Sequence, residues 1–160
     1  MAAERTIAVI GEIGQFCPAL AEKLAQQNLR LLSISNDEEQ KVQLQKQFKN
    51  KKHVAEIEFI HCEKEGCWEA DIIALTQPDK IDPQLIRRIK NVATQKLVLI
   101  ISEENNIKSN EPNFKELLPN SRVVDLIINA DSLEVKISSE DKDAEILVKG
   151  FFNELNYLVN

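Results

Sequence analysis

The sequence predicts an α/β fold in which helices cover both faces of a mainly parallel, doubly wound sheet. Continuous apolar runs, such as IAVI at 7–10 and KLVLIIS at 96–102, are typical of strands buried on both faces. Segments with helical spacing alternate with these runs, as parallel strands joined by crossover helices require. The chain has 160 residues, the size of one domain. We therefore expect a single three-layer domain over 1–160, with a sheet of about six to eight strands.

The first half of the chain begins with a β-branched apolar strand at 6–10, which Gly11 ends. Pro18 fits the first turn of a helix, because the N–H groups of that turn have no partner within the helix. Asn28 closes this helix. The elements that follow are a strand at 29–35, a polar helix at 38–50 with an apolar stripe of Val42, Leu44 and Phe48, and a loosely alternating strand at 53–61.

The second half continues the alternation. Trp68 lies in the connection that precedes a buried strand at 70–76, and Pro78 stops that strand. The remaining elements are a helix at 83–92 that buries Leu85, Ile86 and Ile89, a strand at 96–102, a loop at 103–112, a short helix at 113–118, strands at 121–128 and 134–138, and a closing helix at 143–155 that buries Ile146, Leu147, Phe151 and Leu155.

Composition excludes several classes of function. A net charge of −6 gives no electrostatic footprint for nucleic acid or for an anionic membrane. No apolar run approaches the roughly 20 residues of a membrane span, and the start MAAERT does not resemble a signal peptide. We expect a cytoplasmic location. The three cysteines, Cys17, Cys62 and Cys67, are an odd number, so we expect reduced thiols rather than a disulfide framework.

A turn containing glycine follows the first strand and opens the first helix, which is the context of a dinucleotide phosphate site. The full fingerprint is G-x-G-x-x-G. When the sequence is aligned with this fingerprint on Leu20 and Ala21, Glu12 occupies the position of the first glycine, Gly14 that of the second and Cys17 that of the third. Gly11 lies one residue before the position of the first glycine. The carboxylate of Glu12 would lie beside the negative pyrophosphate, unless the turn points it outward. The predicted phosphate turn consists of Gly11, Glu12, Ile13, Gly14, Gln15, Phe16 and Cys17.

Motifs along nearly the whole chain resemble one family of enzymes. They are IAVIG with GQFCPALA, ADIIALTQP, KLVLIIS, NFKELLPNSRVVDLIIN and SSEDKDAEILVKGFFNEL. Together they resemble the NADP-dependent oxidoreductases of the deazaflavin-coenzyme (coenzyme F-420) type, relatives of the imine and pyrroline reductases. The resemblance implies a Rossmann-like NAD(P)-binding fold, an oxidoreductase activity and a homodimer.

The resemblance also implies the position of the cofactor. Thr76, Gln77 and Pro78 would lie over the nicotinamide ribose, and the ribose selector would be Ser35, Asn36 and Asp37. The family tends to carry a Ser-Arg pair at the selector, and here Asn36 replaces the arginine. An aspartate at this distance from the glycines bonds a 2′-hydroxyl and repels a 2′-phosphate, so we expect NAD rather than NADP if any cofactor binds. Alternatively, Asn36 and Asp37 simply cap the next helix.

Two hypotheses about function remain open. The first is an NAD(P)-binding oxidoreductase. The second is a degenerate member of the family that has kept the fold, lost cofactor binding and catalysis, and serves as a binding or dimeric interaction protein. Glu12 and Cys17 favour the second hypothesis, and the TQP sequence at 76–78 favours the first. The family continues beyond its last helix with residues that shape the substrate pocket, whereas this chain ends at Asn160, so we expect the substrate side to be largely missing.

Other chemistry has weaker support. His61, Cys62, Cys67 and the distant His53 do not have the spacing of a closed four-ligand zinc site, so we expect no metal. Cys17 is the best-placed nucleophile because a helix N-terminus stabilises a thiolate, although a small residue filling a glycine position is the simpler interpretation. The sequence identifies no catalytic residue and no substrate.

Overall fold

A computed structural model of the chain describes residues 5–11, 18–35, 37–49, 54–104, 112–129 and 131–160. The strands are β1 (Arg5–Ile10), β2 (Leu29–Ile34), β3 (Glu56–Ile60), β4 (Ile72–Thr76), β5 (Leu97–Glu103), β6 (Arg122–Asn129), β7 (Glu134–Ser138) and β8 (Leu158–Val159). The helices are α2 (Pro18–Ala25), α3 (Glu38–Lys49), α4 (Glu63–Glu69), α5 (Pro83–Ile89), α6 (Phe114–Leu117) and α7 (Lys142–Glu154), with a 3-10 turn η1 (Pro78–Lys80).

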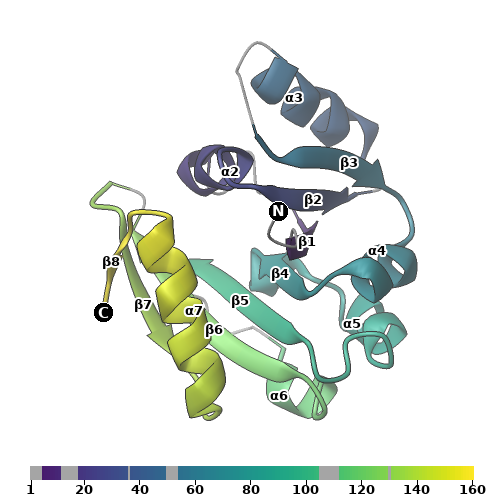
Figure 1. Cartoon of the computed structure of the whole chain (residues 1–160). Helices are drawn as coiled ribbons and strands as arrows, with labels where there is room; N and C mark the ends of the chain where they lie inside the picture. Colours follow the sequence, from purple (N-terminus) through teal and green to yellow (C-terminus); the bar gives the residue numbers. More distant parts are fainter. Residues whose placement is uncertain (1–4, 12–17, 36, 50–53, 105–111, 130) are drawn as a thin grey trace.

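All eight strands form one sheet in the order β3-β2-β1-β4-β5-β6-β7-β8 (Figure 1). Neighbouring strands from β3 to β6 are parallel, β7 runs antiparallel to β6, and β8 is parallel to β7. The first six strands therefore have the 3-2-1-4-5-6 order of a dinucleotide-binding fold. The predicted α/β class and the mainly parallel sheet are confirmed.

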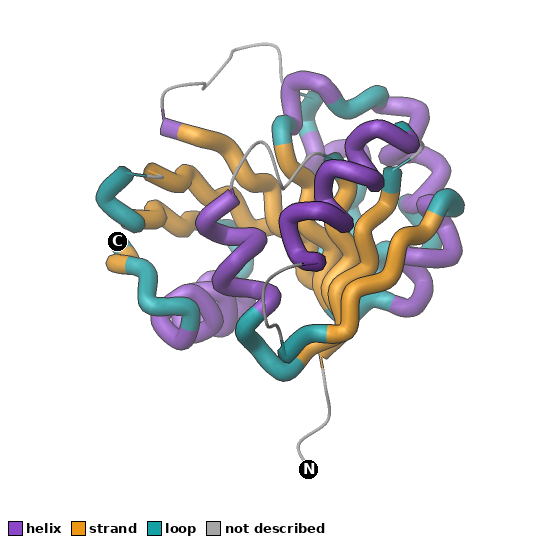
Figure 2. The backbone as a smooth tube through the Cα atoms, turned by 90° about the horizontal axis from the view of Figure 1, so that it is seen from above, coloured by secondary structure: helices purple, strands orange, loops and turns teal. Residues whose placement is uncertain are grey.

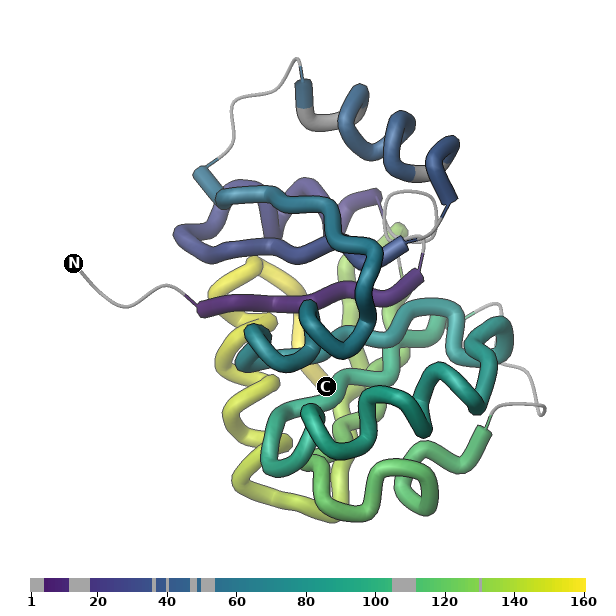
Figure 3. Tube along the Cα trace, turned by 90° about the vertical axis from the view of Figure 1, so that its right-hand side faces the viewer, coloured from purple at the N-terminus to yellow at the C-terminus, as the bar shows by residue number. Residues whose placement is uncertain are grey.

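Helices pack on both faces of the sheet (Figure 2). One apolar core joins the sheet to α2, α3 and α7, and the other joins it to α4, α5 and α6; Figure 3 shows α7 in yellow on one side and α6 in green on the other. Strand β1 contributes to both cores, because Ile7 and Val9 face the first and Ala8 and Ile10 face the second. Burial on both faces explains why this strand reads as a continuous apolar run.

The predicted inner face of the closing helix is wrong in part. Ile146 and Leu147 of α7 are 67% and 53% exposed. The stripe that packs on the sheet consists of Ala144, Val148, Phe151, Phe152 and Leu155. Both sets are apolar at helical spacing, so the pattern alone did not identify the inner one. The same error affects α3, where Leu44 is buried but Val42 is 43% exposed, and the side chain of Phe48 lies outside the description.

The connection assigned to Trp68 contains the helix α4. The sequence did not predict this helix because it is only seven residues long and contains Gly66. That glycine lets α4 approach β2, since a Cβ at this position would lie 2.6 Å from Ile34 Cδ1. Cys62 occupies the N-cap of α4, and Trp68 is 71% exposed while Cys67 is buried.

The sequence also missed η1 and the short strand β8. Of the predicted loop at 103–112, residue Glu103 ends β5, and residues 105–111 lie outside the description. Within the described ranges, no helix combines the length and the apolar character needed to cross a membrane.

Candidate functional site

The sheet has a topological switch point at β1. The chain leaves β1 towards β2 and β3 on one side, and then returns to place β4 on the other side. In open parallel sheets a crevice forms at this point beyond the carboxyl ends of the strands, and ligands bind there. Gly11 follows β1, Ser35 follows β2, and Thr76 ends β4. The described members of the predicted site therefore lie at the expected edge of the sheet.

Gly11 and Thr76 join the ends of β1 and β4. The hydroxyl of Thr76 is buried and donates a hydrogen bond of 3.0 Å to the carbonyl oxygen of Ile10. Gly11 has φ of +111°, where side chains are rarely tolerated. A Cβ at Gly11 would collide with Thr76 Oγ1 and lie 3.0 Å from the backbone oxygen of Thr76. The close approach of these two strand ends therefore requires glycine at residue 11.

The backbone turns sharply immediately after β4. Gln77 adopts φ 51° and ψ 62°, the left-handed conformation, which costs about 1–2 kcal/mol for a residue other than glycine. Pro78 is buried and begins η1, and the N–H of Lys80 donates to the carbonyl of Gln77 at 2.9 Å. Backbone strain of this kind gathers at ligand sites, which makes the end of β4 a candidate for one.

Asp37 caps the helix α3. Its Oδ1 accepts a hydrogen bond of 2.9 Å from the N–H of Glu39, and its own N–H donates to Ser35 Oγ at 3.0 Å. The capping role considered for Asp37 is therefore present. A cofactor hydroxyl bound here would share the carboxylate with the helix. Asn36 and the turn residues Glu12, Ile13, Gly14, Gln15, Phe16 and Cys17 lie outside the described residues.

The described part of the chain contains no group of three or more His, Cys, Asp or Glu side chains that could hold a metal ion. His61 Nε2 lies 3.9 Å from Glu38 Oε1, and the neighbouring Cys62 is exposed. Burial raises the pKa of the Cys67 thiol to about 12, so this cysteine stays protonated near neutral pH.

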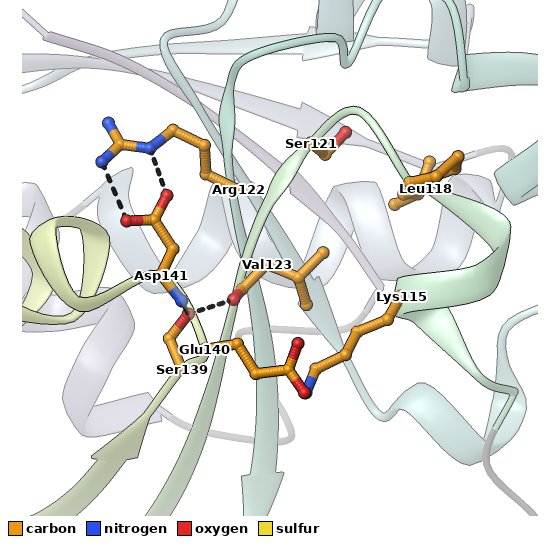
Figure 4. A pocket seen from close by; sticks show the side chains of 9 residues that line it. Lys115, Leu118, Ser121, Arg122, Val123, Ser139, Glu140 and Asp141 are labelled. Atoms are coloured by element: carbon orange, nitrogen blue, oxygen red, sulfur yellow. Dashed lines mark hydrogen bonds and ion pairs between the residues drawn. The ribbon is translucent and has the colours of Figure 1, made fainter.

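A hollow lies at the opposite edge of the sheet, where β6 begins and β7 ends. Its volume is about 300 Å³, and no local sequence pattern marks it, because its lining comes from α6, the start of β6 and the connections from α6 to β6 and from β7 to α7. Figure 4 shows Lys115 reaching towards Glu140, with an Nζ–Oε1 distance of 3.1 Å, and Arg122 paired with Asp141 at 2.8 Å. The hydrogen bond from Arg122 is the main cause that lowers the pKa of Asp141 to about 2. These four charges therefore pair with one another within the chain.

No model of a protein family matches the sequence, and no curated protein matches it. Solved structures do resemble it. Pyrroline carboxylate reductase from Plasmodium falciparum, with NADP bound, has 16% identity and a TM-score of 0.67 over 98% of this chain and 56% of that one. Pyrroline-5-carboxylate reductase from Coxiella burnetii has 15% identity and a TM-score of 0.68 over 98% of this chain and 58% of that one.

An imine reductase variant from Myxococcus stipitatus, in complex with NAD+, has 15% identity and a TM-score of 0.62 over 99% of this chain and 53% of that one. The present chain thus spans little more than half the length of these three structures. At such low identities the likeness shows the fold alone. That fold is the Rossmann-type α/β fold of NAD(P)-dependent reductases.

Proposed function

We propose that this chain is an NAD(P)-binding, oxidoreductase-like domain that holds its cofactor at the switch point between β1 and β4. The observation that carries the proposal is the junction of Gly11 and Thr76, where a glycine with φ of +111° lets the two strand ends meet. A dinucleotide site needs such a close backbone approach directly after the first strand. Solved structures with this fold have NADP or NAD+ bound.

Different residues would contact different parts of the cofactor. The pyrophosphate would lie against the predicted turn from Gly11 to Cys17, before the N-terminus of α2, where a helix favours an anion. The ribose would lie near Ser35 and Asp37, and the nicotinamide near the strained end of β4. When bound, the cofactor supplies hydride chemistry, and the chain's own groups orient it.

The cofactor is NAD rather than NADP in this proposal. The supporting group is Asp37, which follows β2 and carries a carboxylate that a 2′-phosphate would meet as a like charge. The motifs quoted above also support the finer assignment to reductases of the deazaflavin-coenzyme type. Oxidation of the reduced deazaflavin by NADP or NAD in the presence of this chain would test that assignment.

The alternative is a protein with the same fold that has lost cofactor binding and catalysis and acts as an interaction protein. Glu12 favours it, because a carboxylate at the first glycine position of the turn opposes a pyrophosphate. Titration of NADH and NADPH into the purified chain by calorimetry distinguishes the two. We expect NADH to bind more tightly than NADPH. The absence of heat with either cofactor at millimolar concentration would reject the oxidoreductase assignment, and tighter binding of NADPH would reject the role given to Asp37.

A further inference from the structure

We propose that the outer face of α7 is a homodimer interface in which two copies of this helix pack antiparallel about a twofold axis. The outer face consists of Lys142, Asp143, Ile146, Leu147, Gly150, Asn153 and Glu154, all of them exposed. Helical geometry places these residues on the side opposite the stripe that packs on the sheet. Figure 1 shows this helix lying in front of β6 and β7. The proposal does not depend on cofactor binding.

The first observation is the apolar centre of this outer face. Ile146 and Leu147 are 67% and 53% exposed and adjacent in the chain. The other large apolar side chains that are exposed among the described residues, Val42, Val54, Trp68 and Leu158, occur singly along the sequence. Single exposed apolar residues are common on protein surfaces, whereas a cluster on one helix face is typical of an interface.

The second observation is Gly150, one of only four glycines in the chain. It lies in the middle of α7, where glycine is less favourable than alanine. A Cβ at this position would meet no atom within 4 Å, so packing within the chain does not require a glycine there. A second helix that approaches closely would require it.

The third observation is charge complementarity in one register. When the twofold axis of the antiparallel helix pair passes at the level of Val148, Ile146 of one copy lies over Gly150 of the other. The same axis places Lys142 opposite Glu154, and Asp143 opposite Asn153, each twice. The isologous contact therefore combines an apolar side chain over a glycine at its centre with opposite charges at both ends. Lys142 Nζ donates to the Ser139 carbonyl at 3.0 Å and lies 3.4 Å from Glu145 Oε1, and its side chain, which is 74% exposed, can turn from these contacts towards the second copy.

The size of the helix sets the strength of the dimer. A helix of 13 residues is about 20 Å long, so a pair of them buries less than the roughly 1,200 Å² of total area at which standard-size interfaces begin. We therefore expect a weak dimer, with a dissociation constant on the order of 10 µM or weaker.

Sedimentation velocity of the full chain, over a series from micromolar to near-millimolar concentration, tests the proposal. The unmodified chain should shift from monomer to dimer along the series. Ile146→Asp should weaken association about tenfold or more. Val42→Asp, which places the same charge on an exposed apolar position of α3, is the matched control and should leave the dissociation constant unchanged. A monomer at every concentration, or equal effects of the two variants, would overturn the proposal.

Two further variants test the packing and the register. Gly150→Ala should raise the melting temperature of the dilute monomer and yet weaken the dimer. If Gly150 did not lie in the dimer interface, the substitution would stabilise the monomer without weakening the dimer. Lys142→Glu should weaken the dimer about two- to fivefold, and adding Glu154→Lys to it should restore the original dissociation constant. Failure of the double variant to recover would reject this register.

Discussion

Substitution of Gly11 tests whether the meeting of β1 and β4 at the switch point requires glycine at this residue. Gly11→Ala should lower the free energy of unfolding by about 1–3 kcal/mol through the backbone strain at φ of +111°, and its Cβ would also collide with Thr76 Oγ1. Urea denaturation measures this loss. Gly150→Ala is the matched control, because its Cβ meets open space, and it should raise the stability of the dilute protein by about 0.5–1 kcal/mol.

A double variant separates strain from collision in the same experiment. Thr76→Ala removes the hydroxyl that a Cβ at Gly11 would meet, so Gly11→Ala combined with Thr76→Ala should be less destabilising than the sum of the single variants. Strict additivity would contradict the contact between these two residues. Equal effects of alanine at Gly11 and at Gly150 would contradict the special conformation of Gly11.

The charge of Asp37 should set the choice between the two cofactors. Asp37→Ser keeps a residue that can cap α3 and removes the carboxylate that a 2′-phosphate would meet, so the affinity for NADPH relative to NADH should rise by about tenfold. Calorimetric titration of both cofactors measures the ratio. Asp82→Ser provides the control, because Asp82 caps α5 through an equivalent bond of 2.9 Å to the N–H of Gln84. An unchanged ratio in Asp37→Ser, or an equal change in Asp82→Ser, would contradict the role of Asp37.

At the scale of single elements, burial on both faces made the parallel strands predictable. Strand β4 is buried at every position and β1 at its last four, which leaves no alternation that could suggest another structure. The helices were harder to predict. In α7 the residues Ile146 and Leu147 are as apolar as the buried Val148, and only packing against β6 and β7 distinguishes them. The short helix α4 forms because Gly66 permits its approach to β2, a reason that becomes visible only in three dimensions.

The orientation of α7 leads to a prediction about stability. Phe152 is 1% exposed and meets the rings of Phe151 and Tyr157 edge-on, with centroids 5.7 and 5.4 Å away. Phe152→Ala should therefore cost about 3–5 kcal/mol of unfolding free energy. Leu147→Ala, on the outer face, should change it by less than about 0.5 kcal/mol in the dilute monomer. Urea denaturation checks both values. A large loss in Leu147→Ala would mean that the outer face is packed within the chain.

The candidate site was predictable from sequence to the extent that it depends on strand ends. Gly11, Thr76, Gln77 and Pro78 follow or end strands that the apolar runs identified, so their place at one edge of the sheet follows from the topology. The left-handed conformation of Gln77 could not be predicted, since no residue type preference marks it. The bond between Thr76 and Ile10 joins residues that are 66 positions apart, and only the folded sheet brings them together.

For the molecule as a whole, the switch point and the outer face of α7 are separate surfaces. The first lies at the carboxyl ends of β1, β2 and β4, whereas α7 packs on β6, β7 and β8. A cofactor that binds only the folded chain stabilises it by about 2.7 kcal/mol at a concentration 100 times its dissociation constant. For a chain of 160 residues, that corresponds to a rise in melting temperature of about 5–10 °C.

Thermal denaturation with and without NADH should therefore show this rise in the unmodified chain, and the same rise in Ile146→Asp, because the substitution weakens the dimer without touching the switch point. Asp37→Ser should reduce the rise with NADH, since it removes a ribose partner. If Ile146→Asp abolished the rise, the two surfaces would be coupled and their separation would be wrong. If no variant responded to NADH or NADPH while the dimer persisted, the chain would be an interaction protein built on a reductase fold.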